Sequence, residues 1–322
     1  MAQRAALAAG VLALCLGAAR EAAAQHSASG ALTGGAQPGA GESGGARRDP
    51  IRLGSGRFER GGGDSVSWSD DWRGFGVGHG ALMGVAVTSA AAAYAIGPDA
   101  DSVWSRRFGV DEAARDALRG RSRRARLVAR DASDLSLTLA VSHTVLVDAV
   151  ILTGWYRDSP DVALQLTLIS MEALAFTSAL QTLSNLVSSR ERPYVRECGA
   201  DVPELAGDCV QDNQHRSFFS GHTSLAFAAA SVGCVHRTKV PIYGQGSALA
   251  PCALGFGLAA ATGALRMVAD YHYFSDVAVG ALVGTAVGLG VPLVLHYRSP
   301  DPQGVSLALA PSPGGAGLLG VF

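Results

Sequence analysis

The stretch FFSGHTSLAF, residues 218–227, places an aromatic pair and a Ser-Gly-His triplet directly before a run of small and apolar residues. The run has the composition of a helix. Ser220 is suited to cap its start, because a serine hydroxyl accepts a hydrogen bond from a backbone N–H of the first turn. Gly221 and His222 then present free N–H groups at the positive end of the helix dipole. The stretch therefore predicts an anion site at the start of a helix.

The composition of the whole chain is apolar. Of its 322 residues, 48% are hydrophobic and 16% are charged, which is more apolar than is usual for a soluble domain. The 41 glycines fit closely packed membrane helices, in which small residues let backbones approach. A general compositional bias toward Ala and Gly is the alternative. The net charge of -1 provides no overall attraction to nucleic acid, so no nucleic-acid partner is expected.

Four regions follow from the pattern of apolar residues. Residues 1–24 have the features of a secretory signal peptide, with an Ala-x-Ala cleavage pattern that ends at Ala24. Residues 25–67 are rich in Gly, Ser and Ala and are expected to form a disordered linker. Residues 68–297 hold the helical domain. Residues 298–322 form a short tail or a small hairpin that turns at Pro-Ser-Pro-Gly-Gly.

Six apolar segments in the helical domain predict an all-α, six-helix bundle. Several approach the roughly 20 residues needed to cross a bilayer, so we expect a bundle embedded in or associated with a membrane. His143, Asp148 and Glu172 lie inside the segments and are expected to face the bundle interior or a cavity. The Arg-rich stretch SRRFGVDEAARDALRGRSRRARLVARDASD, residues 105–134, predicts an amphipathic surface helix that contacts anionic headgroups. The six segments are 77–96, 132–155, 162–189, 222–235, 248–267 and 275–296.

Three short stretches at the ends of these segments have the composition of a phosphate site. Arg192 and Arg266 are present among them, and paired guanidiniums can hold phosphoryl oxygens bidentately, which a single lysine cannot do. The residue before proline is pushed out of helical geometry, so the third segment should stop near Arg192. The stretches are SSRERPYV at 188–195, FSGHTS at 219–224 and LRMVADYHYFSD at 265–276.

The histidines of these stretches suit a transfer of the phosphoryl group. Asp276 follows His272 by four residues, so on one helix face its carboxylate can accept the imidazole N–H. The other ring nitrogen of His272 is then free to act as a nucleophile. His222, at the helix start, is the natural general acid for the leaving oxygen.

These spacings resemble those of the type 2 phosphatidic acid phosphatase and vanadium haloperoxidase superfamily, over roughly residues 77–296. The pattern of that family is Lys-x6-Arg-Pro, then Pro-Ser-Gly-His, then Ser-Arg-x5-His-x3-Asp. This chain matches it at Arg192, Pro193, Ser220, Gly221, His222, Arg266, His272 and Asp276. It departs from the pattern at Asn185 in place of the lysine, Phe219 in place of the proline and Leu265 in place of the leading serine.

The resemblance implies a role for each matching residue. His272 would attack phosphorus and form a phosphohistidine, Asp276 would orient it, and His222 would act as the acid and then activate water. No metal or other cofactor takes part, and vanadate would be an inhibitor. Arg190, two residues before Arg192, is an auxiliary candidate for the charge that Asn185 lacks. The phosphate-binding residues would be Arg192, Ser220, Gly221 and Arg266.

The sequence therefore predicts a metal-independent phosphatase for phosphate monoesters or diphosphates, carried on a lipid or isoprenoid or on a small ester. One alternative is a haloperoxidase with vanadate as its cofactor. Others are a weakened relative that binds lipid phosphates without the motif lysine, and histidines that are merely satisfied polar residues at helix ends. A zinc site at His222, His272 and Asp276 is disfavoured, because two adjacent arginines would repel the cation.

Two features disagree about the side of the membrane that the site faces. A cleaved signal peptide puts residue 25 outside, and six spanning segments would then leave the connection at 190–220 inside. That connection contains Cys198 and Cys209, spaced as for a short disulfide loop, which favours export. We therefore expect an outward-facing site in the cell envelope, with either the first segment not spanning or the bundle partly peripheral on the outer side of the membrane. Cys234 and Cys252 are a second candidate pair or are buried thiols.

Overall fold

The computed structural model describes most of the helical domain and a C-terminal hairpin. The predicted signal peptide, residues 25–62 of the predicted linker, and Cys209 lie outside the described residues. The described residues are 63–99, 104, 107–198, 211–244, 246, 248–298, 306–312 and 315–321.

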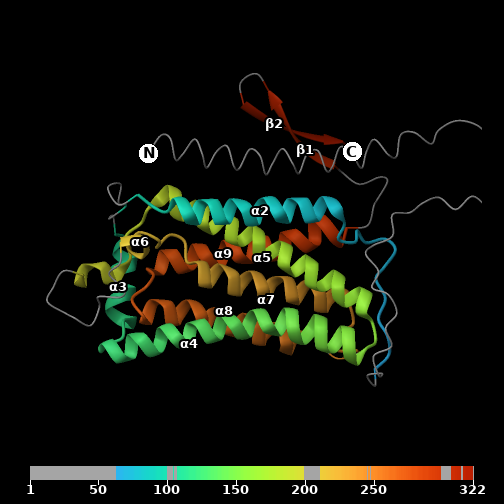
Figure 1. Ribbon diagram of the computed structural model, residues 1–322, viewed down its shortest axis with the longest axis horizontal. Helices are drawn as coiled ribbons and strands as arrows, with labels where there is room; N and C mark the ends of the chain where they lie inside the picture. Colours follow the sequence, from blue (N-terminus) through green and yellow to red (C-terminus); the bar gives the residue numbers. More distant parts are fainter. Residues whose placement is uncertain are drawn as a thin grey trace, which may run out of the picture.

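Six long helices form the bundle within the described residues, which confirms the predicted all-α fold class (Figure 1). Short helices α3, η2 and α6 lie in the connections. The elements are α2 (Val77–Ile96), α3 (Gly109–Leu118), α4 (Arg123–Ser142), η1 (His143–Tyr156), α5 (Pro160–Ser188), η2 (Pro193–Glu197), α6 (Gln211–Gln214), α7 (Gly221–Lys239), α8 (Leu249–Val268), α9 (Phe274–Gly290) and η4 (Val291–His296). Here η1 continues α4 and η4 continues α9 without interruption.

The Arg-rich stretch 105–134 is not the single surface helix that the sequence predicted. It is divided between α3 and the first three turns of α4. The division occurs because Ser122 caps α4, its hydroxyl accepting a hydrogen bond from the N–H of Ala125 at 3.1 Å. The helix that begins at Arg123 then runs to Tyr156, past residue 132, where we expected the second apolar segment to begin.

Helix α7 lies at the centre of the bundle and packs against α4, α5, α8 and α9, while α2 covers α5 from outside (Figure 1). Its closest neighbour is α9, which presents three glycines four residues apart to the α7 backbone. A Cβ at Gly280, Gly284 or Gly288 would lie 2.1 to 2.8 Å from a backbone oxygen of α7 or of its cap residue Ser220. Small residues therefore let the two backbones touch. This contact sets the start of α9 beside the start of α7.

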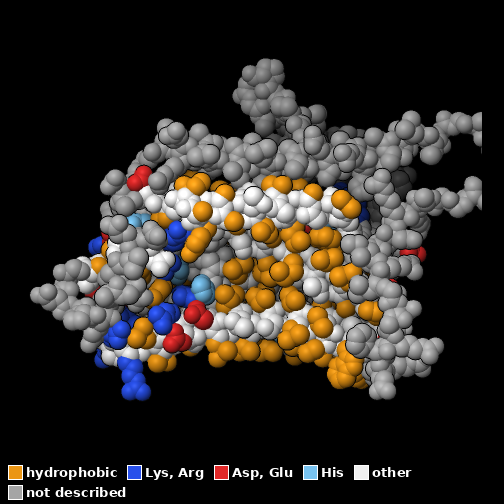
Figure 2. Space-filling model, in the orientation of Figure 1, with side chains coloured by type: hydrophobic (Ala, Val, Ile, Leu, Met, Phe, Trp, Pro, Cys, Tyr) orange, Lys and Arg blue, Asp and Glu red, His pale blue; other side chains and the backbone are white. Residues whose placement is uncertain are grey.

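Within the described residues, five helices are long and apolar enough to cross a membrane by length and composition. These helices indicate membrane association. Figure 2 shows hydrophobic side chains along the helices and charged side chains gathered at one end, where α3 and α6 lie. The central α7 is not among the five, and its core positions are mostly small residues. The five are Val77–Ile96, Arg123–Tyr156, Pro160–Ser188, Leu249–Val268 and Phe274–His296.

The C-terminal residues form the hairpin that was one of two expectations for the tail. Strands β1 (Ser306–Ser312) and β2 (Gly315–Val321) pair antiparallel, with Ser312 opposite Gly315.

The cysteines of the bundle are oxidised. Cys234 of α7 and Cys252 of α8 are joined in a disulfide bond, as one of the two expectations for them had it. Cys198 is also disulfide-bonded. The partner expected for it, Cys209, lies outside the described residues.

Candidate active site

The three phosphate-site stretches meet at the end of the bundle where α5 ends and α7 and α9 begin. Backbone hydrogen bonds join them directly, so their relative positions do not depend on side chains alone. The N–H of Ser220 donates to the carbonyl of Asp276, and the N–H of Ser217 donates to the carbonyl of Arg190. The N–H of Tyr194 donates to the carbonyl of Asp270, and each of the three distances is 3.1 Å.

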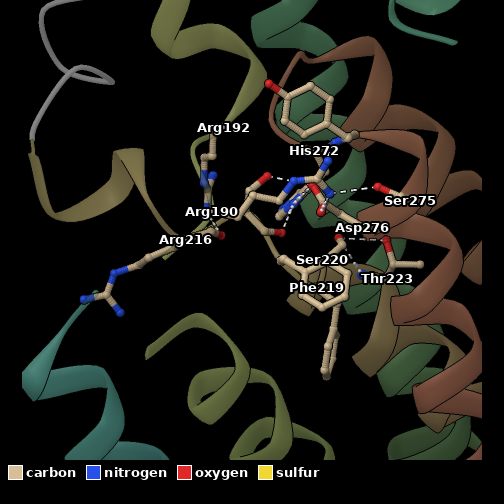
Figure 3. Close-up of polar contacts among 12 residues, drawn as sticks. Arg190, Arg192, Arg216, Phe219, Ser220, Thr223, His272, Ser275 and Asp276 are labelled. Carbon is tan, nitrogen blue, oxygen red and sulfur yellow. Dashed lines mark hydrogen bonds and ion pairs between the residues drawn. The ribbon is translucent and has the colours of Figure 1, made fainter. Parts of the chain in front are cut away.

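His272 lies at the centre of this junction and is only 4% exposed. Its Nδ1 is 2.9 Å from the carbonyl oxygen of Ser217 (Figure 3). A carbonyl can only accept, so Nδ1 carries the hydrogen and Nε2 keeps a free lone pair. Burial, more than the nearby charges, lowers the pKa of His272 to about 4. The ring is therefore a neutral imidazole near pH 7, as a nucleophile must be.

We expected Asp276 to orient His272 directly, but the ring of His272 donates its hydrogen bond to the carbonyl of Ser217. Oδ2 of Asp276 lies 3.8 Å from Nδ1 of His272, so the direct hydrogen-bond partner of the ring is Ser217, not this carboxylate. His272 precedes α9, and Asp276 lies in the first turn, where Oδ2 accepts from the N–H of Tyr273 at 2.9 Å. The four-residue spacing thus reflects a helix start and not one face of a helix. Ser217 connects the two groups, since its hydroxyl donates to Asp276 at 2.6 Å.

Arg190 does not supply the charge missing at Asn185, contrary to our expectation. Its side chain is 1% exposed and its guanidinium is held by two carboxylates, those of Asp276 and Asp111. The distance to Asp111 Oδ2 is 2.7 Å, and Ser275 Oγ lies at 2.7 Å. Figure 3 shows the guanidinium beside Asp276 and Ser275. Arg190 therefore positions Asp276, and two carboxylates occupy its guanidinium.

Arg192 and Arg266 have few anionic partners. Among the described residues, Arg192 forms no ion pair, and its Nη2 donates only to the carbonyl of Arg216, at 3.3 Å. Arg266 pairs with Asp134. Each has a buried Nε–H without a hydrogen-bond partner within the described structure. Tyr271 lies between them, its ring centre 5.1 and 5.6 Å from the two guanidinium carbons. Burial lowers the pKa of Arg192, and unpaired N–H groups of this kind favour an anionic ligand.

His222, the expected acid, contacts a carboxylate that the sequence did not point to. Its Nε2 is 3.0 Å from Oδ1 of Asp134 on α4, which also pairs with Arg266. The pKa of His222 is below its usual value because of burial first and then the charges of Arg266, His272 and Arg192. The nearby carboxylate, whose side chain is 51% exposed, favours the charged form instead.

At the start of α7, Ser220 caps the helix as expected, but its own N–H already has a partner. Ser220 is fully buried and its hydroxyl caps the helix, accepting from Thr223 Oγ1 at 2.9 Å. Its own N–H is bound to Asp276, so Ser220 supports the helix start and offers no amide to a phosphate. The N–H groups of Gly221 and His222 have no hydrogen-bond partner in the part of the chain that is described. A Cβ at Gly221 would lie 3.0 Å from the Gln181 side chain, so little room exists there for a larger residue.

Asn185, at the lysine position of the motif, is buried near the end of α5. Its side-chain Oδ1 has no hydrogen-bond partner in the described structure. Its backbone carbonyl accepts from Ser189 N at 3.0 Å, where α5 ends in a left-handed residue. No hydrogen bond joins Asn185 to Arg192 or His272 among the described residues.

Sequence reasoning missed four residues of this region. Asp111 and Asp134 come from the Arg-rich region that we took for a membrane-surface helix, and only the tertiary fold brings them to the motif residues. Ser217 lies three residues before Ser220, so its nearness to the motif was the one signal available. Tyr271 lies beside His272, but nothing in its spacing indicated that it packs against two arginines.

Part of the chain is similar to known proteins. Residues 166–300 match the family model of the PAP2 superfamily. A protein of Klebsiella pneumoniae described as "Uncharacterized 22.5 kDa protein in cps region" is 36% identical over 90 residues, which is 28% of this chain. This chain covers 42% of that relative's length, less than half of it. The family match includes the three phosphate-site stretches, whereas Asp111 and Asp134 precede it.

Proposed function

Residues 166–300 belong to the PAP2 superfamily, whose members are phosphatases or haloperoxidases, and from this premise we propose that the protein hydrolyses phosphate monoesters or diphosphates through a phosphohistidine. The observation that carries the proposal is that two arginines with few anionic partners lie beside a neutral histidine. Arg192 and Arg266 have a single, half-exposed carboxylate between them, and they lie beside a neutral histidine whose tautomer is fixed. The negative oxygens of a phosphoryl group can bind the two guanidiniums, and its phosphorus can be attacked by the unprotonated nitrogen of the histidine.

Binding of the phosphate would use the two guanidiniums and the helix start. Arg192 and Arg266 hold its peripheral oxygens, and the N–H groups of Gly221 and His222 donate to it from the positive end of α7. Asp134 must then release Arg266 or share it, because both the carboxylate and the phosphate are acceptors for the same guanidinium. Such preorganised donors stabilise the charge that builds up during transfer.

The first chemical step forms a bond between Nε2 of His272 and phosphorus while the bond to the leaving oxygen breaks. His222 gives its proton to that oxygen, and the bound phosphate dianion favours the protonated form of His222. The positive charge that develops on His272 is stabilised through Nδ1–H by the Ser217 carbonyl, with the Asp276 carboxylate 3.8 Å away.

The second step releases inorganic phosphate. The now neutral His222 takes a proton from water, the water oxygen bonds to phosphorus, and the bond from phosphorus to Nε2 of His272 breaks. Both histidines return to their starting states, so the cycle needs neither an oxidant nor a metal ion at the phosphate-binding residues.

The substrate that we propose is a phosphorylated lipid or isoprenoid, with small phosphate esters as further substrates. This is supported by the five apolar helices and by the charged end of the bundle next to them (Figure 2). Export to the cell envelope is supported by the disulfide between Cys234 and Cys252, because such bonds persist in oxidising compartments. A site that faces outward is supported by Cys198, which is disulfide-bonded at the same end of the bundle as Arg192.

The experiment is turnover and trapping in detergent. Purified protein is given p-nitrophenyl phosphate and a phosphatidate, and a rapid quench with labelled substrate looks for an acid-labile, base-stable phosphoryl group on the protein. His272→Ala should lose both turnover and label. His143→Ala, which removes a histidine at the other end of the bundle, serves as the matched control and should keep both. Near-normal turnover by folded His272→Ala would contradict the mechanism.

Two additions separate the alternatives. Vanadate should inhibit, because it mimics the trigonal bipyramidal phosphoryl group, and a brief exposure to EDTA should leave turnover unchanged. Loss of activity in EDTA that a divalent metal restores would point to metal-assisted hydrolysis. Bromide oxidation by the vanadate-loaded protein, without phosphatase turnover, would favour the haloperoxidase alternative. Binding of phosphatidate without turnover would favour a silent lipid-phosphate binding protein.

A further inference from the structure

A second cluster of ionisable side chains lies far from the phosphate-binding end. It consists of His79 in the first turn of α2, Glu172 in α5 and His296 at the end of η4. Helix α9 starts beside His272, and α9 with η4 spans about 30 Å before it reaches His296. Glu172 and His296 are 0% exposed, and the His79 side chain is 20% exposed. None of the phosphate-site stretches contributes to this cluster.

The hydrogen bonds of His296 require a positive charge next to its ring. Nδ1 lies 3.1 Å from the carbonyl oxygen of Arg73, so Nδ1 must carry the hydrogen. In the neutral ring, Nε2 then presents a lone pair. That atom is 2.7 Å from Oε2 of Glu172, which is also an acceptor when the carboxylate is ionised. Two acceptors so close together need a proton or a metal ion to join them.

His79 contacts the other oxygen of the Glu172 carboxylate. Its Nδ1 is 3.0 Å from Oε1 of Glu172, and its ring centre is 4.4 Å from that of His296. All three ligand atoms lie within 4.8 Å of one another. Two nitrogens and a carboxylate oxygen thus converge from three different helical segments.

The surroundings favour a metal ion over a proton alone. In the described structure, Glu172 forms no ion pair with an arginine or lysine, whereas Asp148 at the same end of the bundle pairs with Arg237. A histidine whose other nitrogen donates to a backbone carbonyl, as His296 does to Arg73, has the pattern usual for metal-ligating histidines. Two histidines and a glutamate are also a donor set that binds zinc tetrahedrally, with the fourth position left to a non-protein ligand.

We propose that His79, Glu172 and His296 bind one divalent transition-metal ion, with zinc the best match to the donors. The ion would clamp the first turn of α2 to α5 and to the end of η4. It would also hold the segment before α2, since Arg73 N donates to the carbonyl of His296 at 2.8 Å and Phe75 N donates to Gln165 at 2.6 Å. The ion would lie at the end of the bundle away from the phosphate-binding residues.

The test measures metal in untagged, detergent-purified protein, because a histidine tag would bind zinc itself. Elemental analysis should find about one zinc per chain, and X-ray absorption should give nitrogen and oxygen ligands at about 2.0–2.2 Å. Cobalt added to the chelated protein should give the intense visible bands of a tetrahedral site. Prolonged chelation should lower the Tm of the wild-type protein, and zinc should restore it.

Variants then assign the ion to this cluster. Glu172→Gln keeps the shape of the side chain and should reduce bound zinc to about a tenth or less. His143→Ala, which removes a histidine from the Asp148 and Arg237 network, should keep the full amount. His272→Ala should also keep its zinc, and Glu172→Gln should still form the phosphohistidine, so the two proposals fail independently.

Several results would overturn the proposal. One is wild-type protein that purifies without metal, binds neither zinc nor cobalt and shows no change of Tm with either, which would assign a proton to the cluster. Another is folded Glu172→Gln that holds zinc at the wild-type level. If Glu172→Gln does not fold, the X-ray absorption and cobalt spectra of the wild-type protein still decide the question.

Discussion

At the end of the bundle where α5 stops, Arg266 pairs with one half-exposed carboxylate and Arg192 forms no ion pair among the described residues. At the other end, buried acids are bound by several partners. Asp148 pairs with Arg237 and accepts from Tyr243 at 2.7 Å. Both oxygens of Glu172 are bound by histidines. A buried charge without a partner is costly, so an end that keeps guanidiniums unpaired must gain from an anion that binds there. The other end needs no anion, because its buried charges already have partners, and these pairs stabilise the fold.

The largest expected effect comes from two arginines that are two residues apart and have opposite roles. Arg192→Ala should lower kcat about 10²–10³-fold with little change in Tm, because it removes a donor to the phosphoryl group and leaves no buried acid unpaired. Arg190→Ala should reduce stability by about 3–5 kcal/mol, because it leaves Asp111 and Asp276 buried without their partner.

Steady-state turnover and thermal unfolding, measured on both variants, check this pair of expectations. If Arg192→Ala unfolds readily while Arg190→Ala remains stable and inactive, then the roles assigned to the two arginines are reversed.

The glycines of α9 lie along its contact with α7, between the two ends of the bundle. Substituting one of them should have the next largest effect. A Cβ at Gly284 would lie 2.1 Å from the carbonyl oxygen of Ser224. Gly284→Ala should therefore destabilise the protein by about 1–3 kcal/mol or more and lower activity, because α9 carries Asp276. Gly257→Ala on α8, where no atom lies within 4 Å of the new Cβ, is the control and should be neutral or stabilising by up to about 1 kcal/mol.

Thermal unfolding of Gly284→Ala and Gly257→Ala in the same detergent gives the comparison. Equal stability of the two would mean that α9 does not pack directly on the α7 backbone.

The pH dependence of activity should be smaller and should favour acid. His272 has a pKa of about 4, so it stays neutral and able to attack until the pH falls to that range. His222, whose pKa is lowered to about 3, loses its proton as the pH rises, so kcat/KM should already decline between acid and neutral pH. Asp134→Asn should move this decline to lower pH, since a carboxylate 3.0 Å away favours the charged ring.

A pH profile of kcat/KM for wild-type protein and Asp134→Asn tests this, and a maximum at alkaline pH would contradict it. Stability follows the same sign. The folded state holds His272 neutral, so the unfolded chain binds more protons below its usual pKa, and stability should be lost as the pH falls from there toward about 4.

The smallest effect is expected at Asn185. Lysine there would add a positive charge that stabilises the transferred phosphoryl group, so Asn185→Lys should raise turnover on small phosphate esters by a few-fold. It should also lower stability slightly, because the new charge is buried near the end of α5. Turnover and Tm of the folded variant decide the matter, and unchanged turnover would mean that another group replaces the motif lysine.

The sequence by itself determined the helices and the motif residues. Apolar segments of membrane length, a serine cap before Gly221, and proline after Arg192 are local signals, because hydrogen bonds within a few residues set where a helix begins and ends. The spacing from Arg266 through His272 to Asp276 likewise predicted a candidate nucleophile and its neighbours without any knowledge of distant contacts.

Only the tertiary structure decided which partners these residues have. Arg190 is two residues from Arg192, yet it is held by Asp111 from α3 and Asp276 from α9. Asp134 reaches His222 from α4, and His79, Glu172 and His296 meet from three helical segments far apart in sequence. Pairing of buried charges depends on how helices pack and on which unpaired groups would be costly, and a single sequence carries no local signal for either.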